Sequence, residues 1–531
     1  MTTAALLTVL LVAPLIYFLV GYPLAARLRR PRLALVAGLG LTGWVCEFII
    51  LAGVPAWVPF AGLAGFVGLG WCRVRRSEVR ACLGEVYLVY SWPLAAVLLT
   101  PFPGMGPWSM DWLYVFQTGQ AVMGNLPYGG PMLERPPLGG ASCIPLWLIA
   151  DGLPTFQVWS AVASAALVLV GMELYHELGG TRGGVRVWLP LLASCFFLHH
   201  TMLGWAKFLA AGLTLSGLLL MRRAESGRGN WTAGSVLFAL SVATHQSAIL
   251  YGPFVLLFGL NAGLLQGVRR LAIALAAGLV FVLPFEVWTI RTFGLDAKVN
   301  SNPAMAQRNP NESAGLRAGF MLLSTFVPWN TIEDAARCLS GAPVAPGLYW
   351  LATGILTALA GTLLGSAVPF LPLRRAPPVP RPWVSVLTSR GAVACLVLAV
   401  VGNALLSPYS AKWGSAQTGV VPVQVMLFVV LIRWLDDAGE RSQKRVNGLV
   451  LALGILPYAL LATGVTVWLR TGGSAAHDAF LTWDDNDYET LLAEADGRSL
   501  AFALFPAGPF LAAGLMLVPW LVRAESEPVR R

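Results

Sequence analysis

The sequence predicts an all-α polytopic membrane protein. Hydrophobic residues make up 56% of its 531 residues and charged residues only 12%, and the mean hydropathy is +0.68. A soluble protein of this composition could not keep so much apolar surface away from water. The apolar residues also form runs that are long enough to cross a hydrocarbon core of roughly 30 Å.

We expect about fifteen transmembrane helices from these runs. The first run has no basic residue before it and the segment RLRRPR after it, which indicates a retained signal-anchor helix with its N-terminus outside. The arginine-rich loops then alternate onto the cytoplasmic side and the C-terminus lies inside. The runs begin near residues 4, 33, 57, 83, 155, 187, 204, 230, 248, 271, 346, 391, 420, 447 and 501.

The chain divides into three expected regions. Residues 1–82 hold extra N-terminal transmembrane helices, residues 83–300 form a transmembrane core, and residues 301–531 form a C-terminal transmembrane region. The first external loop carries an amphipathic stretch and an apolar stretch that is too short to span, both suited to the membrane interface. The external loops are 101–154, 290–345, 409–419 and 470–500, and the two stretches are 109–123 and 138–150.

Composition also excludes several classes of function. The net charge of +10 comes from short basic clusters between apolar runs, as in cytoplasmic loops, so we expect no binding of nucleic acid. The seven cysteines have no CxxC spacing, and no disulfide or zinc framework is indicated. The chain has no GxxxxGK[ST] phosphate loop, GxSxG elbow or HExxH motif, which argues against an ATP-driven pump or a hydrolase of those classes.

The most informative segment lies in the first external loop. Asp111 opens a short predicted helix, and the box Glu134-Arg135-Pro136-Pro137 follows about two dozen residues later. Ionisable residues beside membrane helices are costly unless they are solvated or used. The two prolines would present the charged pair on a rigid, extended backbone. Asp111, Glu134 and Arg135 are therefore candidate active-site residues.

These motifs resemble the GT-C superfamily of membrane glycosyltransferases. The resemblance covers roughly residues 83–300 and rests on the order of a helix, a loop with an early Asp on an amphipathic helix, an acidic-basic-Pro-Pro box and an apolar near-spanning helix. It is nearest to the branch of protein O-mannosyltransferases and aminoarabinose lipid A transferases. The segments that carry it are DWLYVFQTGQAVMGN, ERPPLGGASCIPLWLI, LHHTMLGWAKFLAAGLTL, SVATHQSAILYGPFVLLFGL and LPFEVWTIRTFG.

The resemblance implies roles for individual residues. Asp111 would take the acceptor hydroxyl proton as the anomeric carbon becomes oxocarbenium-like. Arg135 would bind the donor phosphate, and Glu134 could position the acceptor or a metal. The family often has a second acidic residue where this chain has Lys207, which suggests phosphate binding by Lys207 and leaves a two-carboxylate mechanism in doubt. Asp111 could equally cap its helix, and Glu134-Arg135 could be an exposed ion pair.

Other polar residues could complete the site. His245 near the outer end of a predicted helix could bind phosphate, or a divalent metal together with Glu134, although a polar helix end explains it as well. Arg291 and Lys412 could supply further positive charge for a phosphate, although solvated surface charge is the alternative.

We therefore predict a polyprenyl-phosphate-sugar-dependent glycosyltransferase in a bacterial inner membrane. It would transfer a sugar to a glycan, lipid or protein acceptor at the outer face of the membrane. Two alternatives remain open. One is a glycan polymerase or ligase that uses polyprenyl-pyrophosphate donors, and the other is a lipid-linked sugar flippase or transporter. Transport predicts charges at mid-bilayer depth and two-fold internal symmetry, and the sequence offers only Glu47 and Glu173 as candidate buried acids.

Overall fold

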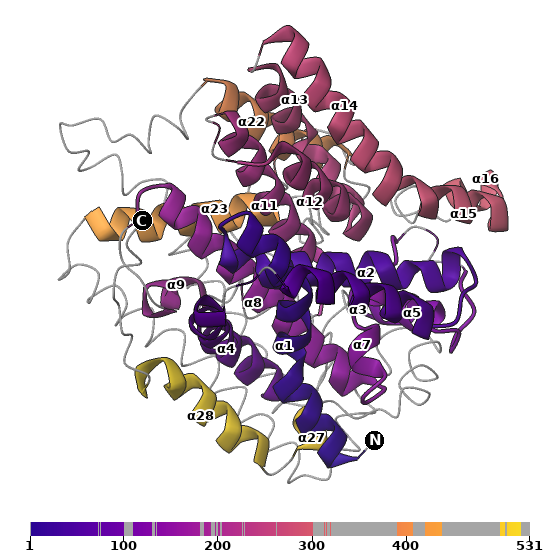
Figure 1. Cartoon of the computed structure of the whole chain (residues 1–531), viewed down its shortest axis with the longest axis vertical. Helices are drawn as coiled ribbons and strands as arrows, with labels where there is room; N and C mark the ends of the chain where they lie inside the picture. Colours follow the sequence, from indigo (N-terminus) through magenta and orange to yellow (C-terminus); the bar gives the residue numbers. More distant parts are fainter. Residues whose placement is uncertain are drawn as a thin grey trace.

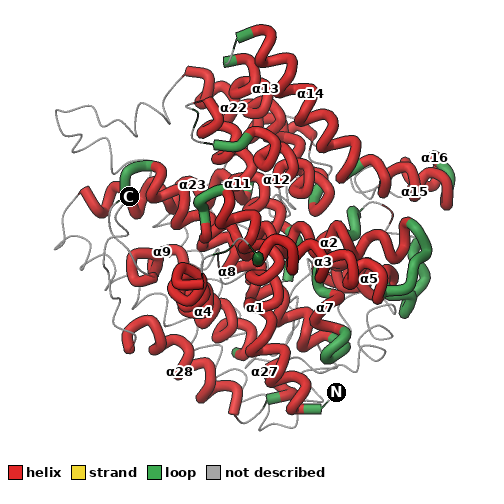
Figure 2. Tube along the Cα trace, in the orientation of Figure 1, coloured by secondary structure: helices red, strands yellow, loops and turns green. Residues whose placement is uncertain are grey.

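The computed structural model describes an all-helical bundle (Figures 1 and 2). It describes residues 2–300 apart from gaps, of which 100–109 is the longest, isolated positions between 313 and 319, and residues 390–406, 420–437, 500–504 and 507–521. These residues form helices, turns and loops and no strands. The predicted helices near residues 346 and 447 lie outside them.

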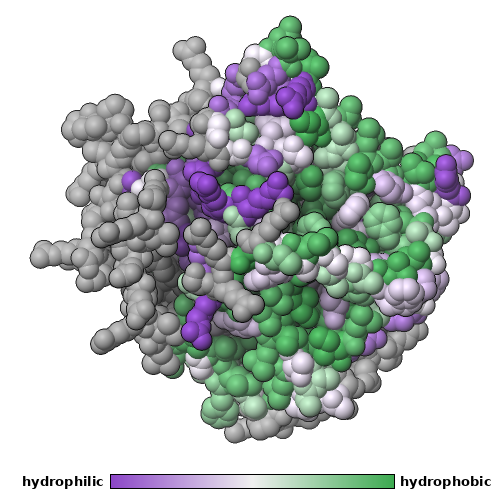
Figure 3. Space-filling model, viewed as in Figure 1, coloured by the Kyte–Doolittle hydropathy of each residue, from purple (hydrophilic) through white to green (hydrophobic). Residues whose placement is uncertain are grey.

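Five helical segments among the described residues are long and apolar enough to cross a membrane. They are Thr3–Arg27 (α1), Pro31–Leu51 (η1 with α2, Ala34–Leu51), Glu78–Leu98 (within α4, Arg76–Leu98), Leu153–Glu177 (α8) and Leu264–Phe281 (α14). The α14 helix exposes a row of large apolar residues that includes Leu265, Val268 and Leu275, as expected of a helix that faces lipid. Figure 3 shows hydrophobic residues over much of the described face.

Several predicted spans coincide with helices that have fewer than 18 residues within the described part of the chain. The helices α3 (Trp57–Trp71), α12 (Trp231–Thr244), α13 (Gly252–Leu260), α22 (Arg390–Leu406), α23 (Val421–Asp437) and α28 (Ala507–Leu521) have fewer than 18 residues. The run expected near residue 187 contains the short η3 (Val185–Trp188) and α9 (Leu189–Leu192). The count of fifteen spans and the orientation of the termini therefore stay predictions.

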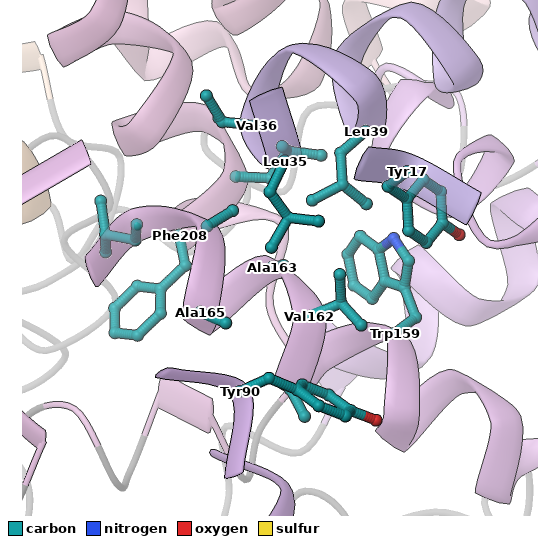
Figure 4. Close-up of a cluster of buried hydrophobic side chains, with 14 of the residues drawn as sticks. Tyr17, Leu35, Val36, Leu39, Tyr90, Trp159, Val162, Ala163, Ala165 and Phe208 are labelled. Carbon is teal, nitrogen blue, oxygen red and sulfur yellow. The ribbon is translucent and has the colours of Figure 1, made fainter. Parts of the chain in front are cut away.

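The core forms where α1, α2, α4, α8 and α11 (Lys207–Glu225) meet. The α8 helix lies at the centre with all residues of its apolar window buried. Figure 4 shows Trp159 of α8 beside Tyr17 of α1, with Leu39 of α2 nearby. The first two helices of the region expected as an N-terminal addition thus pack into the core: Gly21 of α1 and Gly38 of α2 approach so closely that neither could carry a side chain.

The segment between α4 and α8 has the expected helices among its described residues. The amphipathic stretch becomes α5 (Met110–Val122), and the apolar stretch becomes two single-turn helices, α6 (Leu138–Ala141) and α7 (Ile144–Trp147). Neither α6 nor α7 could span a membrane, so the prediction of a non-spanning element is confirmed. Ser142 fixes their junction, because Tyr17 of α1 donates to its carbonyl at 2.5 Å and Trp159 of α8 donates to its hydroxyl at 2.7 Å.

The basic segments gather at one end of the bundle. Arg30 pairs with Glu173 and, at 3.7 Å, with Glu177, which also pairs with Arg223 at 2.7 Å. Arg32 makes two 2.8 Å hydrogen bonds to Glu85. These pairs join the start of α2, the end of α8 and the end of α11, so the end of α2 and the starts of α8 and α11 lie at the opposite end.

Candidate functional site

Helix α5 and the Glu-Arg-Pro-Pro box meet at this opposite end. The guanidinium carbon of Arg135 lies 5.0 Å from the centre of the Tyr114 ring, a distance at which the ring face attracts the cation. Asp111 lies in the first turn of α5, three residues before Tyr114. The backbone turn that carries Asp111 therefore lies beside Arg135. The side chain of Asp111 and all of Glu134 lie outside the described residues.

Glycines let the helices around the box approach one another. A Cβ atom added to Gly140 of α6 would stand 2.6 Å from the backbone nitrogen of Gly119 in α5, and closer still to the Val115 carbonyl. One added to Gly139 would stand 2.8 Å from the Cβ of Ala206, next to Lys207. Small residues at such crossings allow backbones to touch. The start of α11 thus lies directly beside the end of the box.

Lys207 is buried, which differs from the expected position at an open membrane surface. The residue is 3% exposed, and its ammonium nitrogen lies 3.3 Å from the centre of the Trp205 ring. A buried ammonium needs compensation, and an aromatic face supplies part of it. Trp205 itself is 3% exposed, so it packs inside the protein rather than at the interface. Lys207 therefore supplies positive charge from within the protein.

His245 lies at the same end of the bundle as Lys207. Helices α11 and α12 run antiparallel, with Gly217 against Gly234, so the end of α12 lies level with the start of α11. The backbone N–H of Ser247 donates to the Nδ1 atom of His245 at 3.3 Å. This contact caps the next helix, η4 (Gln246–Tyr251), and supports the alternative of a polar helix-end residue.

Lys298 reaches the box from a distant part of the chain. It lies in α16 (Leu295–Asn300), which follows α15 (Leu283–Phe293). Its ammonium donates to the Leu133 carbonyl at 2.5 Å and pairs with Glu286 at 3.2 Å. In contrast, Arg291 of α15 is exposed, and Lys412 lies outside the described residues. Among the described residues, Lys298 therefore brings a cation to Leu133, the residue immediately before the box.

Tyr128 links the box to α15. Its hydroxyl donates to the Arg135 carbonyl at 3.1 Å, and its ring packs edge-on against Trp288 at 5.2 Å. Burial of the hydroxyl raises the pKa of Tyr128 well above its ordinary value, and the charges of Glu47 and Glu286 raise it further. The hydroxyl therefore stays protonated and keeps its role as a donor. Tyr128 could not be identified as a site residue from the sequence, because a single tyrosine in a loop forms no recognisable motif.

The described residues hold no group of three or more His, Cys, Asp or Glu side chains that could bind a metal ion. The metal ligands expected from the sequence were Glu134 and His245. Glu134 lies outside the described residues, and the Nδ1 atom of His245 accepts the bond from Ser247. A role for a divalent metal stays an untested prediction.

Comparisons with known proteins give one similarity. No protein-family model matches the chain, and no curated protein matches it. The solved structure of ArnT from Cupriavidus metallidurans bound to undecaprenyl phosphate is similar over 83% of this chain and 78% of that chain, with 14% sequence identity and a TM-score of 0.44. At so low an identity and TM-score, this similarity establishes neither the family of the chain nor its activity.

Proposed function

We propose that this protein transfers a sugar from a polyprenyl-phosphate donor to an acceptor hydroxyl at the outer face of the membrane. One observation carries the proposal. Arg135 lies against Tyr114, one helical turn from Asp111, so a candidate phosphate ligand and a candidate base lie on neighbouring elements. The motif resemblance to the GT-C glycosyltransferases implies the same pair of roles.

The reaction needs one base and one anion site. The acceptor oxygen attacks the anomeric carbon, the bond from that carbon to the phosphate oxygen breaks, and the phosphate leaves with the electron pair. Asp111 takes the acceptor proton. Arg135 binds the phosphate on which negative charge develops, and its guanidinium geometry suits two phosphate oxygens at once. Lys207 adds positive charge, which is more effective in a poorly hydrated interior than in water.

The distribution of charge supports the proposed side of the membrane. The arginines that end α1 and α11 lie at the end of the bundle opposite the box. Short basic loops favour the cytoplasm, which supports a position of the box at the outer face. A polyprenyl carrier would bring its sugar there, because its chain lies in the bilayer while its phosphate stays at the interface.

Radiolabelled sugar transfer in proteoliposomes tests the proposal. We would supply a panel of polyprenyl-phosphate sugars to the native protein and to Asp111→Asn. Asparagine is nearly the same size as aspartate and cannot take a proton at neutral pH, so the substitution removes the base with little change in shape. We expect transfer to fall by about 10²- to 10⁴-fold, with the thermal stability and donor binding unchanged.

Asp296→Asn provides a matched control, because Asp296 is an exposed acid in the first turn of α16. It should leave transfer unchanged. Equal losses in both variants would mean that a first-turn charge matters only for helix stability. Movement of intact lipid-linked sugar without a new glycosidic bond would replace the proposal with a flippase, and activity only with pyrophosphate-linked donors would replace it with a polymerase or ligase.

A further inference from the structure

Glu47 is a buried acid near the outer end of α2. The residue is 1% exposed, and its Oε1 atom has no hydrogen-bond partner in the structure. Glu173, the other acid expected to be buried, pairs with Arg30 at the basic end. An unpaired buried polar group destabilises a fold by about 1–3 kcal/mol, and more when it is charged. A buried carboxyl group in this state, close to the candidate site, points to a partner that arrives from outside the fold.

Helix α2 aims the face that carries Glu47 at the candidate site. Gly43 lies one turn before Glu47, and a Cβ atom added there would stand 2.5 Å from the Leu138 carbonyl at the end of the box. Residues one turn apart share a helix face. The charge of Glu47 also acts on the hydroxyl of Tyr128, which donates to the Arg135 carbonyl. Glu47 thus lies beside both ends of the Tyr128–Leu138 segment.

The chemical class of the group that would hydrogen-bond to Glu47 can be restricted. A carboxyl group accepts hydrogen bonds when it is ionised and can also donate one when it is protonated, so a partner that both donates and accepts suits either state. The single hydroxyl proton of Tyr128 goes to the Arg135 carbonyl. A phosphodiester linking a sugar to a polyprenol carries no proton at neutral pH and cannot donate either. Sugar hydroxyls are the donors that the proposed substrates bring.

We propose that Glu47 binds a hydroxyl group of the transferred sugar, so that α2 forms one wall of the donor site. This inference rests on the proposed function. It also gives the N-terminal helices a purpose, since they supply a substrate-binding residue in addition to packing. Arg135 then recognises the phosphate of the donor and Glu47 recognises its sugar.

Thermal unfolding with two lipids separates these roles. The probes are undecaprenyl phosphate and the same lipid carrying a hexose, and the variants are Glu47→Met and Thr42→Val. Thr42 also lies in α2, is 0% exposed and has an unpartnered hydroxyl, so its substitution removes a second buried oxygen. A ligand that binds the folded state raises the unfolding temperature in proportion to its affinity.

We expect Glu47→Met to weaken binding of the hexose lipid at least about ten-fold and to leave binding of undecaprenyl phosphate unchanged. Thr42→Val should leave both affinities unchanged. Equal losses for the two lipids, or no loss for either, would overturn the proposal. Without lipid, Glu47→Met should unfold at a higher temperature than the native protein, and a lower one would show that Glu47 has a partner within the fold.

Binding of the two lipids to the native protein distinguishes failure of the proposed function from failure of the sugar contact assigned to Glu47. If the native protein bound neither lipid, the proposed function would fail, and with it the assignment of a sugar to Glu47. A native protein that binds both lipids equally would retain the phosphate site and lose the sugar contact assigned to Glu47.

Discussion

Gly140→Ala tests whether α5 and α6 position the site as the structure shows. The added methyl group would stand 2.3 Å from the Val115 carbonyl oxygen and 2.6 Å from the Gly119 nitrogen, whereas ordinary contacts begin at 3.4 Å. Helix α5 would therefore have to retreat by about 1 Å, a displacement at which transfer can fall by about 10²-fold. Strain of this kind typically costs about 1–3 kcal/mol of stability.

The assay pairs the transfer rate in proteoliposomes with the unfolding temperature in detergent. Gly278→Ala in α14 is the control, since nothing lies within 4 Å of a Cβ atom there. It should unfold no earlier than the native protein, because alanine favours a helix over glycine. If Gly140→Ala matched Gly278→Ala in rate and stability, α5 and α6 would not be in backbone contact and the positional argument would fail.

Two further substitutions test the contacts at either end of the bundle. Lys298→Met removes a charge-assisted hydrogen bond worth about 1.5–3 kcal/mol, so limited proteolysis between α15 and α16 should accelerate. Lys298→Arg should restore much of the protection. Unchanged cleavage would show that the bond to Leu133 does not hold α16 in place. Arg30→Met leaves Glu173, which is 4% exposed, without its partner and should destabilise the protein by about 3–5 kcal/mol, measured by thermal unfolding. Arg30→Met/Glu173→Met should recover most of that loss, and a double variant no more stable than the single one would contradict the pairing.

Hydrophobic runs in the sequence predicted helices correctly where one long apolar run forms one helix. The expected starts near residues 4, 33 and 155 match α1, the α2 segment and α8. Each run is apolar for 18 or more residues, so burial and backbone hydrogen bonding favour the same structure. Within the run near residue 187 the structure describes η3 and α9 but not residues 193–196, so a continuous helix there stays a prediction.

The candidate site could be predicted only in part. Asp111 and the box were found because they interrupt an apolar sequence. The contact between Lys298 and Leu133 joins segments 165 residues apart, and no local pattern encodes such a pairing. Glu47 was recognised as a candidate buried acid, but α2 seemed to belong to an appended module, so its position beside the box could not be inferred. Burial of Lys207 depends on Trp205 and on the helices packed around it in the same way.

Charged groups are compensated differently at the two ends of the bundle, and this difference supports the end at which we propose that the ligand binds. At the basic end, Arg30 and Glu173 neutralise each other within the fold. At the other end, Arg135 and Lys207 lie over aromatic rings, and Glu47 keeps an oxygen without a hydrogen-bond partner. A ligand that brings an anion together with hydroxyl donors complements this end and not the other, and a sugar joined to a lipid phosphate has both.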